Sequence, residues 1–482
     1  MKRTTFVRRP VLALFPALGA ALMLVGCANP GGAIPSQARL ANINLLNTAE
    51  SLIGHTVSPA NWPHANWWQR YGDPQLNQIV AEALVDSPSL RVAQSRMRQA
   101  EAVSGLAKAA GKPQINASLK STRQKYSEHS TVPKLIAEDW QTFNDATLSF
   151  SYELDIWGKN EASVQAALDR LHATEVETQA ARLILTSGLV QTYFRLAQSH
   201  EQLELSESIL KQRENIVQLT SQRVAAGIDS DVELKQAESL VPAAKQQVAA
   251  MKEIIAVLRN QLAALLGKGP DRGLALHRPK LALDEPTGLP SVLPVDLIGH
   301  RPDVVAQRWR VEAASQEIKV AHKQFYPSVS LLSFVGFQSL GLDLLLKSGS
   351  QTAGIGPAVS LPIFDGGRLR SNLGVRNADY DIAVEQYNQT IVDALQDVVS
   401  QLTSIQWLAE QRHQQELAVQ TAQTAYQLAL QRYRAGLGTY LQVLATGIQV
   451  HGQNKLLIDL KTRALQLDVN LIRSLGGGLL ET

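Results

Sequence analysis

Residues 431–478 begin QRYRAGLGTYLQVLATGIQV and end LIRSLGGG, and residues 222–269 begin QRVAAGIDSDVELKQAESLV and end LAALLGKG. The two stretches align without a gap at an offset of 209 residues. Each has a helical approach, a turn that contains glycine, and a second helix that ends at glycine. An internal repeat of this kind indicates that two equivalent units build the molecule.

The repeat continues towards the N-terminus. Gly158-Lys159 aligns with Gly367-Arg368 at the same offset, and further upstream the offset becomes 214, so that Pro88 aligns with Pro302. The first unit therefore has five more residues, which lie between Pro113 and Gly158. We divide the chain into residues 1–26, a leader; 27–74, a tether and anchor segment; 75–287, the first repeat; and 288–482, the second repeat.

The composition argues against a nucleic-acid partner. The chain has 482 residues, a formal net charge of +3 and a hydrophobic content of 45%. Four basic residues lie in the leader, so the charge without the leader is about −1. The sequence also lacks a basic patch with interleaved aromatic residues, which marks nucleic-acid-binding surfaces. We therefore expect no nucleic-acid binding.

The leader resembles a bacterial signal peptide. A charged start precedes an apolar run from Val11 to Val25, which is too short to span a membrane. The run ends at Leu24-Val25-Gly26-Cys27, which resembles a lipobox, and Cys27 is the only cysteine. We expect a covalent lipid on Cys27 and no other cofactor; the alternative is an incidental cysteine in an ordinary signal peptide. Ala28 follows instead of Asp, as in lipoproteins sent to the outer membrane.

The tether is followed by a tryptophan pair, Trp67-Trp68. Exposed tryptophans would be available to bind a ligand. The interpretation that we prefer is that both rings anchor the tether on the folded body, because large aromatic side chains bury much apolar surface.

Four segments alternate apolar and polar residues with a period of two, as strands with two different environments do. They are expected at about 113–125, 143–156, 327–338 and 352–364 and form two hairpins. They would suit half of a soluble sandwich. Their length of about ten residues and the outer-membrane address also fit a membrane barrel, which four strands cannot close alone. Several chains would then contribute strands to a cyclic homo-oligomer.

Long helices are expected at about 158–269 and 367–476. The stretch from Gly158 to Gly227 alone would make about 100 Å of helix. Leu189, Leu196, Leu203, Leu210 and Val217 recur every seven residues, which predicts a coiled-coil seam. Neither helix pair has the apolar run of about 20 residues that a membrane-spanning helix needs. We expect them in water on the periplasmic side, either as a solvated coiled coil or lining a conduit.

Several motifs resemble the TolC-type outer-membrane efflux proteins, specifically their NodT-like lipoprotein branch. They occur in family order and cover nearly the whole chain after the leader: WWQRYGDPQL (67–76), YELDIWGK (152–159), RPDVVAQRWRVEAA (301–314), FYPSVSL (325–331), LPIFDGGRLRSNL (361–373) and SLGGG (474–478). The resemblance implies a homotrimer whose chains each give four strands to a shared transmembrane β-barrel and two helix hairpins to a periplasmic α-helical barrel. Such a mixed α+β channel in the Gram-negative outer membrane is the passive exit duct of a tripartite pump, which exports drugs or other toxic small molecules.

The resemblance also implies partners and roles for the hairpin tips. An inner-membrane pump drives the export, and a periplasmic adaptor docks at the tips. Here the docking positions are Arg223 and Gly227 in the first turn and Arg432 and Gly436 in the second.

The tips should also close the duct. The positions that carry gate acids in the family hold Gln442 and Ala445, so we expect negative charge from Asp229, Asp231 and Glu233 instead. The alternative is that Asp229 or Asp231 caps the following helix. The family pairs an acid with a tyrosine across the hairpins, which makes Glu233 and Tyr433 the predicted latch.

No set of catalytic residues is found. The ten histidines have no spacing typical of a metal site, and no Gly-x-Ser-x-Gly motif occurs. We therefore expect neither an enzyme nor a metal protein. The remaining alternative to a duct is a coiled-coil lipoprotein without a channel, an adaptor or envelope scaffold. An adaptor would show one hairpin flanked by lipoyl-like and barrel halves instead of two hairpins with strands. The sequence identifies neither the cargo nor the class of pump.

Overall fold

The computed structural model describes residues 31–42, 46, 62–129, 133–137, 139–281 and 299–478. The predicted signal peptide and Cys27 lie outside these residues. Two compact units are present, and each is described by itself. The sheet unit comprises Met1–Leu40, Arg98–Ala173 and Gln307–Tyr387, and the helix unit comprises Ala41–Met97, Thr174–Ala306 and Asn388–Thr482.

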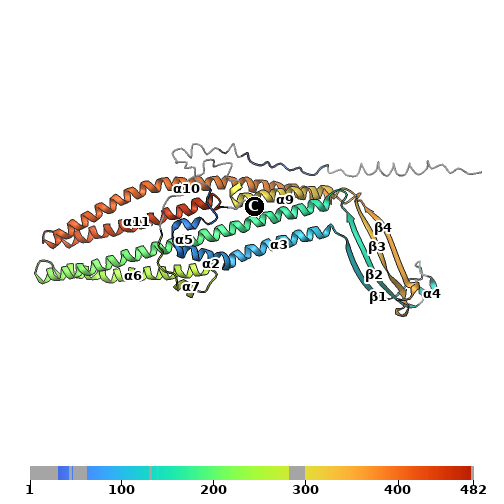
Figure 1. Cartoon of the computed structure of the whole chain (residues 1–482), viewed down its shortest axis with the longest axis horizontal. Helices are drawn as coiled ribbons and strands as arrows, with labels where there is room; N and C mark the ends of the chain where they lie inside the picture. Colours follow the sequence, from blue (N-terminus) through green and yellow to red (C-terminus); the bar gives the residue numbers. More distant parts are fainter. Residues whose placement is uncertain are drawn as a thin grey trace, which may run out of the picture. The chain divides into compact units, whose positions relative to one another are not determined.

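The elements follow the duplicated order expected from the sequence (Figure 1). In the first repeat they are η4 (Trp67–Tyr71), α2 (Pro74–Asp86), α3 (Pro88–Ala110), β1 (Gln114–Lys125), α4 (Lys134–Ala137), β2 (Trp140–Leu154), α5 (Lys159–Ala225), α6 (Asp231–Leu265) and α7 (Asp271–Leu274). In the second they are α9 (Pro302–Lys323), β3 (Ser328–Leu340), η5 (Leu342–Leu344), η6 (Ser348–Ser350), β4 (Gln351–Ser360), α10 (Arg368–Arg434) and α11 (Tyr440–Ser474).

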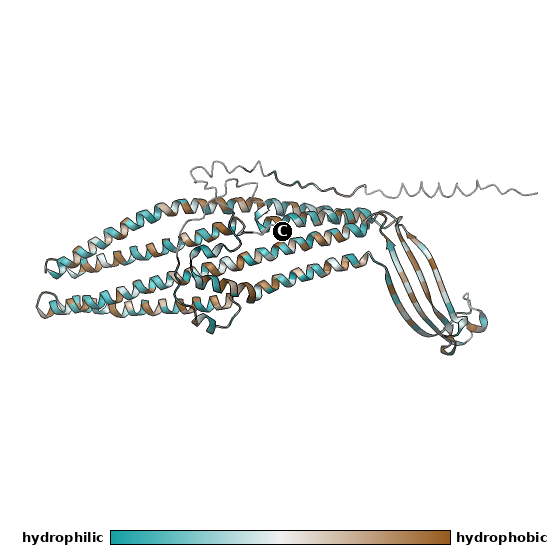
Figure 2. Ribbon diagram, viewed as in Figure 1, coloured by the Kyte–Doolittle hydropathy of each residue, from teal (hydrophilic) through white to brown (hydrophobic). Residues whose placement is uncertain are grey.

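The long helices confirm the repeat. Helices α5 and α10 each contain 67 residues, and α6 and α11 each contain 35. Helix α5 alone is about 100 Å long at 1.5 Å per residue. None of the described helices is both long enough and apolar enough to cross a lipid bilayer. Figure 2 shows why, because hydrophilic and hydrophobic residues are mixed along every long helix.

The predicted seven-residue seam is only partly correct. Leu189 and Leu196 are fully buried, whereas Leu203, Leu210 and Val217 are half-buried. Nearer the tip, Ile216 is buried instead. The reason is the helical repeat of 3.6 residues, which rotates a strict seven-residue stripe by about 20° per heptad. Over five heptad positions the stripe therefore turns away from the interface.

The tryptophan pair lies in the core of the helix unit. Trp67 and Trp68 are each only 5% exposed, and they pack in one apolar cluster with Tyr71 and Phe194. The buried Tyr71 hydroxyl donates a hydrogen bond to Asp468 Oδ2 at 2.7 Å. Both indole rings therefore anchor the N-terminal segment, and neither is exposed to bind a ligand.

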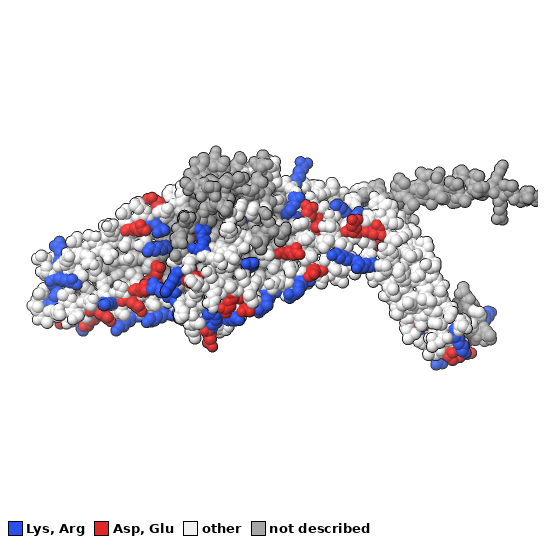
Figure 3. Space-filling view, viewed as in Figure 1, with Lys and Arg blue, Asp and Glu red and all other residues white. Residues whose placement is uncertain are grey.

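In the sheet unit the strands form one antiparallel sheet in the order β1-β2-β3-β4 (Figure 1). Residues paired across strands lie on the same face. One row is Ile115, Phe150, Ser333 and Ile355, and another is Leu154, Val329 and Val359. A row on the opposite face holds Ser118, Thr147, Gly336 and Thr352. The expected apolar and polar faces are thus present, and Figure 3 shows few charged side chains over the middle of the strands.

Two strand ends differ from the sequence prediction. Strand β2 begins at Trp140 instead of about 143, and β4 ends at Ser360 instead of about 364. Pro362 explains the second difference, because proline has no N–H for the strand ladder. Asp365 then accepts hydrogen bonds from the backbone N–H groups of Gly367 and Leu369 at 3.0 and 2.9 Å and starts α10.

An N-terminal segment contacts α10 in the sheet unit. The Asp381 carboxylate accepts hydrogen bonds from the Ser36 hydroxyl at 2.6 Å and from the backbone N–H groups of Gln37 and Ala38 at 3.1 Å. The carboxylate of Asp381, which is far away in the sequence, thus fixes residues 36–38 on α10.

Candidate tip clasp

The two tip turns of the helix unit have the same backbone conformation. Gly227 has a φ of +70° and Gly436 a φ of +77°, which favour glycine. The N–H of Ile228 bonds to the Arg223 carbonyl, and the N–H of Leu437 bonds to the Arg432 carbonyl, each at 2.9 Å. These bonds satisfy the last carbonyl groups of α5 and α10, as at a glycine-terminated helix end.

Arg223 connects the first tip to the second hairpin. Its Nε and Nη2 donate to the two carboxylate oxygens of Asp229 at 2.7 and 2.9 Å. Its Nη1 donates to the Tyr433 carbonyl at 2.7 Å, and the guanidinium carbon lies 4.2 Å from the centre of the Tyr433 ring. Because Arg223 is 7% exposed, this planar fork is largely removed from water.

The Tyr433 hydroxyl completes this arrangement. It donates to Asp229 Oδ2 at 2.6 Å and lies 3.0 Å from the hydroxyl of Thr220. The hydrogen bonds from Arg223 are the main cause that lowers the pKa of Asp229 below its ordinary value. Burial is the main cause that raises the pKa of Tyr433. We call Thr220, Arg223, Asp229 and Tyr433 the tip clasp; it holds an ionised aspartate and a neutral tyrosine.

The predicted contact between Glu233 and Tyr433 is not formed among the described residues. Tyr433 contacts Asp229, whereas Glu233 accepts a hydrogen bond from the N–H of Ser230 at 3.0 Å and another from its hydroxyl. Ser230 therefore caps α6 in a capping box, and neither Asp229 nor Asp231 is the cap. Gln442 has the same role beside Thr439 in the second repeat, and Asp231 is exposed.

The contact between Asp229 and Tyr433 has a signal in the sequence. Asp229 stands two residues after the turn glycine, and this turn reverses the chain towards Arg223 in the last turn of α5. The family spacing of acid and tyrosine favours Glu233 instead, because that spacing does not reflect the local reversal.

The second tip has no equivalent clasp. At the offset of 209, Asp229 aligns with Gly438 and Tyr433 aligns with Val224. Arg432, which aligns with Arg223, is exposed, and within the described part of the chain its side chain donates to the Leu437 carbonyl at 3.4 Å. The duplicated sequence has thus diverged, so that one arginine is buried and the other is accessible.

Sequence reasoning missed an apolar patch at both tips. Ile228 and Val232 are 58% and 62% exposed, and their repeat partners Leu437 and Leu441 are 73% and 68% exposed. We call these four side chains the tip patch. Their equivalent positions in the repeat are the signal that would have revealed them, since four exposed aliphatic side chains have little reason to recur in a solvated turn.

A polar groove lies next to the tip clasp in the helix unit. It has a volume of about 730 Å³ and is lined by α5, α10 and α11, and seven of its eighteen lining side chains are glutamine or asparagine. Lys211 and Arg434 are its charged residues, and His451 also lines it. Burial lowers the pKa of His451 to about 4, so this histidine is neutral at pH 7.

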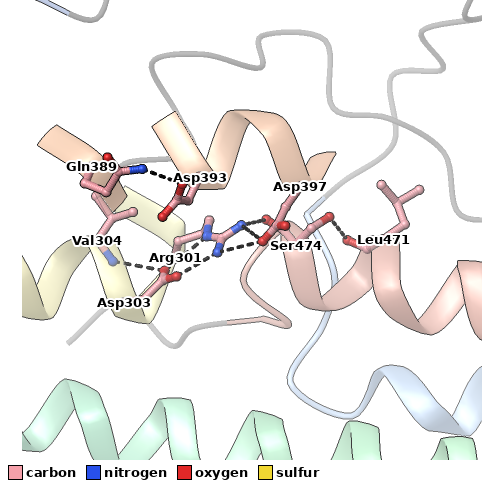
Figure 4. Close-up of polar contacts among 8 residues, drawn as sticks. All are labelled: Arg301, Asp303, Val304, Gln389, Asp393, Asp397, Leu471 and Ser474. Atoms are coloured by element: carbon pink, nitrogen blue, oxygen red, sulfur yellow. Dashed lines mark hydrogen bonds and ion pairs between the residues drawn. The ribbon is translucent and has the colours of Figure 1, made fainter. Parts of the chain in front are cut away.

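A second arginine network starts the second repeat (Figure 4). Arg301 donates to both carboxylate oxygens of Asp303 at 3.0 and 2.7 Å and to the Ser474 carbonyl at 3.1 Å. Asp397 of α10 lies 3.5 Å away. Asp303 Oδ1 also accepts from the N–H of Val304, as expected for an acid at a helix start. This network joins α9, α10 and α11 and leaves no room for a ligand, because Arg301 is 8% exposed.

No metal centre is formed by the described residues, since no group of three or more His, Cys, Asp or Glu side chains converges among them. The side chains at the tips hold each other by hydrogen bonds and ion pairs. This chemistry suits a mechanical closure between two hairpins.

Comparison with known proteins shows which group the chain resembles. The model of a family described as outer membrane efflux protein matches residues 79–268 and 293–477. The fusaric acid resistance protein FusA of Burkholderia cepacia is 40% identical over 368 residues, which cover 75% of this chain and 68% of FusA. The multidrug resistance outer membrane protein MdtP of Escherichia coli K12 is 30% identical over 477 residues, which cover 97% of this chain and 96% of MdtP.

The fold is also similar to that of a solved structure. The crystal structure of the outer membrane protein VceC from Vibrio cholerae superposes with a TM-score of 0.80 at 39% sequence identity. The match covers 87% of this chain and all of the VceC chain.

Proposed function

The chain belongs to the outer membrane efflux protein family, and we propose that three copies of it form the passive exit duct of a tripartite efflux pump. Like that family, it is an outer membrane efflux protein of a Gram-negative bacterium. The observation that carries the trimeric duct is the pairing, in each repeat, of one strand hairpin with one helix hairpin of 67 and 35 residues.

The sheet supports a barrel shared between chains. Each strand has at least ten residues, which meets the length of about 9–11 residues that crosses a bilayer. One sheet face is apolar, and within the described residues β1 and β4 each pair along one side only. Free edges in lipid are excluded, because unpaired backbone groups there cost several kcal/mol. We infer that β4 of one chain pairs with β1 of the next.

The tip clasp supports a gate in its closed state. It fixes the first hairpin to α10 of the second inside one chain, so the two hairpins separate only if the contacts of Tyr433 with Thr220, Arg223 and Asp229 break. Asp231 and Glu233 remain as the acids that would face a passing cation. Arg223 belongs to this clasp and not to the docking surface, because it is buried.

The exposed side of the tips supports docking of a periplasmic adaptor. The tip patch, with the accessible Arg432 beside Gly436, offers apolar contact together with a hydrogen-bond donor. Such a surface fits the end of a coiled-coil hairpin of opposite charge. The inner-membrane pump then supplies the energy, and the duct remains passive.

The lipid anchor remains a proposal, since Cys27 lies outside the described residues. Its support is the lipobox-like sequence and the hydrogen bonds that fix Ser36, Gln37 and Ala38 on Asp381. These bonds give the segment that follows the cysteine a defined place on α10.

For the cargo we propose small organic toxic compounds. MdtP is named for multidrug resistance and FusA for resistance to fusaric acid. The second candidate, an envelope scaffold without a channel, gains no support from the two hairpins and their strands.

Single-channel recording in planar bilayers tests the proposal. Purified full-length protein should give long-lived conductance steps of one size. Purified Cys27→Ser protein should give the same steps once inserted, because the lipid anchors the chain and does not line the duct. A trimer that inserts and never conducts would contradict the duct, and an inert protein that only adheres to the bilayer would favour the scaffold.

A further inference from the structure

A cleft of about 310 Å³ lies in the sheet unit where the strands meet the helices. The end of β2 and the turn into α5 form one wall. The end of α9 with the start of β3 forms another, and the end of β4 with the start of α10 closes the third side. Its lining includes Leu154, Trp157, Lys323, Tyr326 and Arg368.

The charges in this cleft are unbalanced in favour of cations. Glu153 is paired with Lys159 at 2.6 Å, and Asp155 accepts hydrogen bonds from the backbone N–H groups at the start of α5 at 3.0 and 2.8 Å. Both acids are therefore satisfied. Lys323 donates one of its three protons to the Gly158 carbonyl at 2.8 Å. The Arg368 guanidinium has no hydrogen bond or ion pair with the described residues and interacts electrostatically with Asp365, whose carboxylate accepts hydrogen bonds from the backbone N–H groups of Gly367 and Leu369. Two cations thus face the cleft with donors to spare.

An amphipathic aromatic pair lines the same cleft as these cations. Trp157 stacks on Tyr326 with ring centroids 4.9 Å apart, and the Trp157 indole donates to the Pro327 carbonyl at 2.8 Å. The rings are 44% and 40% exposed. Beside them ends the apolar row of Leu154, Val329 and Val359, and the following Phe364 is 92% exposed.

This order of apolar strand, half-exposed aromatic ring and basic side chain is the pattern at the boundary of a bilayer. Phosphates lie at that boundary, and an arginine fork matches a phosphate by two parallel hydrogen bonds. Two cations in the cleft supply hydrogen-bond donors, and no free acid in the cleft balances their charge. The ligand that binds there must therefore be an anionic acceptor.

We propose that this cleft binds the phosphate of a membrane glycerophospholipid, through Arg368 and Lys323, with the acyl chains along the apolar row that ends at Leu154. The inference rests on the proposed membrane-spanning sheet. Phe364 then enters the lipid beside the bound molecule, and the site fixes the depth of each chain in the leaflet that faces the helices.

Native mass spectrometry of the full-length detergent-extracted protein tests the site. The probes are phosphatidylglycerol, the diacylglycerol with the same acyl chains and inorganic phosphate. Wild-type trimers should hold up to one phosphatidylglycerol per chain, and Arg368→Gln should weaken this binding about tenfold, the effect of one charge-assisted hydrogen bond. Arg376→Gln is the matched control, because Arg376 lies on the same helix, pairs with Asp379 and does not line the cleft. Its binding should equal that of wild type.

The outcomes separate this inference from the function. Equal binding by Arg368→Gln trimers, equal binding of diacylglycerol, or displacement of the lipid by millimolar phosphate would each overturn the site alone. A monomer outside the membrane fraction would overturn the duct and the site together. If Arg368→Gln does not assemble, Lys323→Gln replaces it, with the same expected loss, and unchanged binding by that variant would also contradict the proposal. A neighbouring chain that fills the cleft in an image of the trimer would contradict it as well.

Discussion

At the scale of single residues, the tip clasp concentrates the function in one carboxylate. Asp229 receives two donors from Arg223 and one from Tyr433, so that removing its charge releases three contacts at once. Removing the Tyr433 hydroxyl releases two, to Asp229 and to Thr220, and neither involves a charge on tyrosine. The gate should therefore respond more strongly to loss of the Asp229 charge than to loss of the Tyr433 hydroxyl.

We predict that Asp229→Asn raises the open probability of the reconstituted channel severalfold and that Tyr433→Phe raises it less. The reason is that an asparagine cannot receive the charged fork of Arg223. Single-channel recording measures both. Glu233→Gln is the control, since glutamine keeps the capping box, and it should behave as wild type. A gate that opens with Glu233→Gln and stays closed with Asp229→Asn would return the latch to the residue expected from the sequence.

The same carboxylate determines the pH response. Because the folded-state pKa of Asp229 lies below its ordinary value of 3.8, the clasp keeps its full contribution at higher pH and loses it only as the pH falls through that lower value. We predict constant conductance between about pH 7 and pH 5. Asp229→Asn should be open over this range. Acid opening of the wild-type channel near pH 6 would show that another group controls the gate.

At the scale of elements, the sequence predicted the helices and strands better than it predicted individual side-chain contacts. The repeat, the alternating strands and the long helical stretches predicted the two hairpins and the sheet, because these features depend on patterns that repeat every two, three or four residues. The strand end at Ser360 and the acid of the clasp depend on single side chains, Pro362 and Arg223, and on how a turn directs the chain. Periodicity has no information about such contacts.

Helix ends provide an element-scale prediction. A Cβ on Gly476 would overlap the His300 carbonyl, whereas a Cβ on Gly436 would enter open space. Gly436→Ala should cost about 1 kcal/mol from its left-handed backbone alone, and Gly476→Ala roughly 2–4 kcal/mol because the backbone must also move. The temperature at which each variant trimer dissociates on a gel measures which substitution destabilises the protein more. Equal shifts for the two variants would contradict the packing at Gly476.

The two faces of the sheet provide a second prediction at the scale of elements. Ile355 lies on the apolar face of β4 and is 79% exposed, and Ala358 lies on the polar face of the same strand. Ile355→Arg should cost roughly 2–4 kcal/mol in lipid and reduce the heat-resistant protein in the outer membrane. Ala358→Arg should be tolerated. If both arginines are tolerated, the apolar face does not contact lipid.

At the scale of the whole molecule, the account requires more than one chain. Within the described residues, each chain has one sheet whose edge strands β1 and β4 are paired on one side only, and two helix hairpins with polar surfaces, so a closed wall needs copies related by rotation. The sequence alone predicted this need from the number of strands. It did not predict which surfaces remain exposed at the tips, because the tip patch follows from how two turns direct four aliphatic side chains.

The most direct test of the central claim is an electron cryomicroscopy image of the full-length protein, extracted from the outer membrane in detergent. The account predicts a threefold particle with three times the mass of the mature chain, one continuous lumen, and β4 of each chain paired with β1 of the next. Single chains without a lumen, which leave the membrane fraction when Cys27 is replaced by serine, would contradict it and would leave the scaffold as the function.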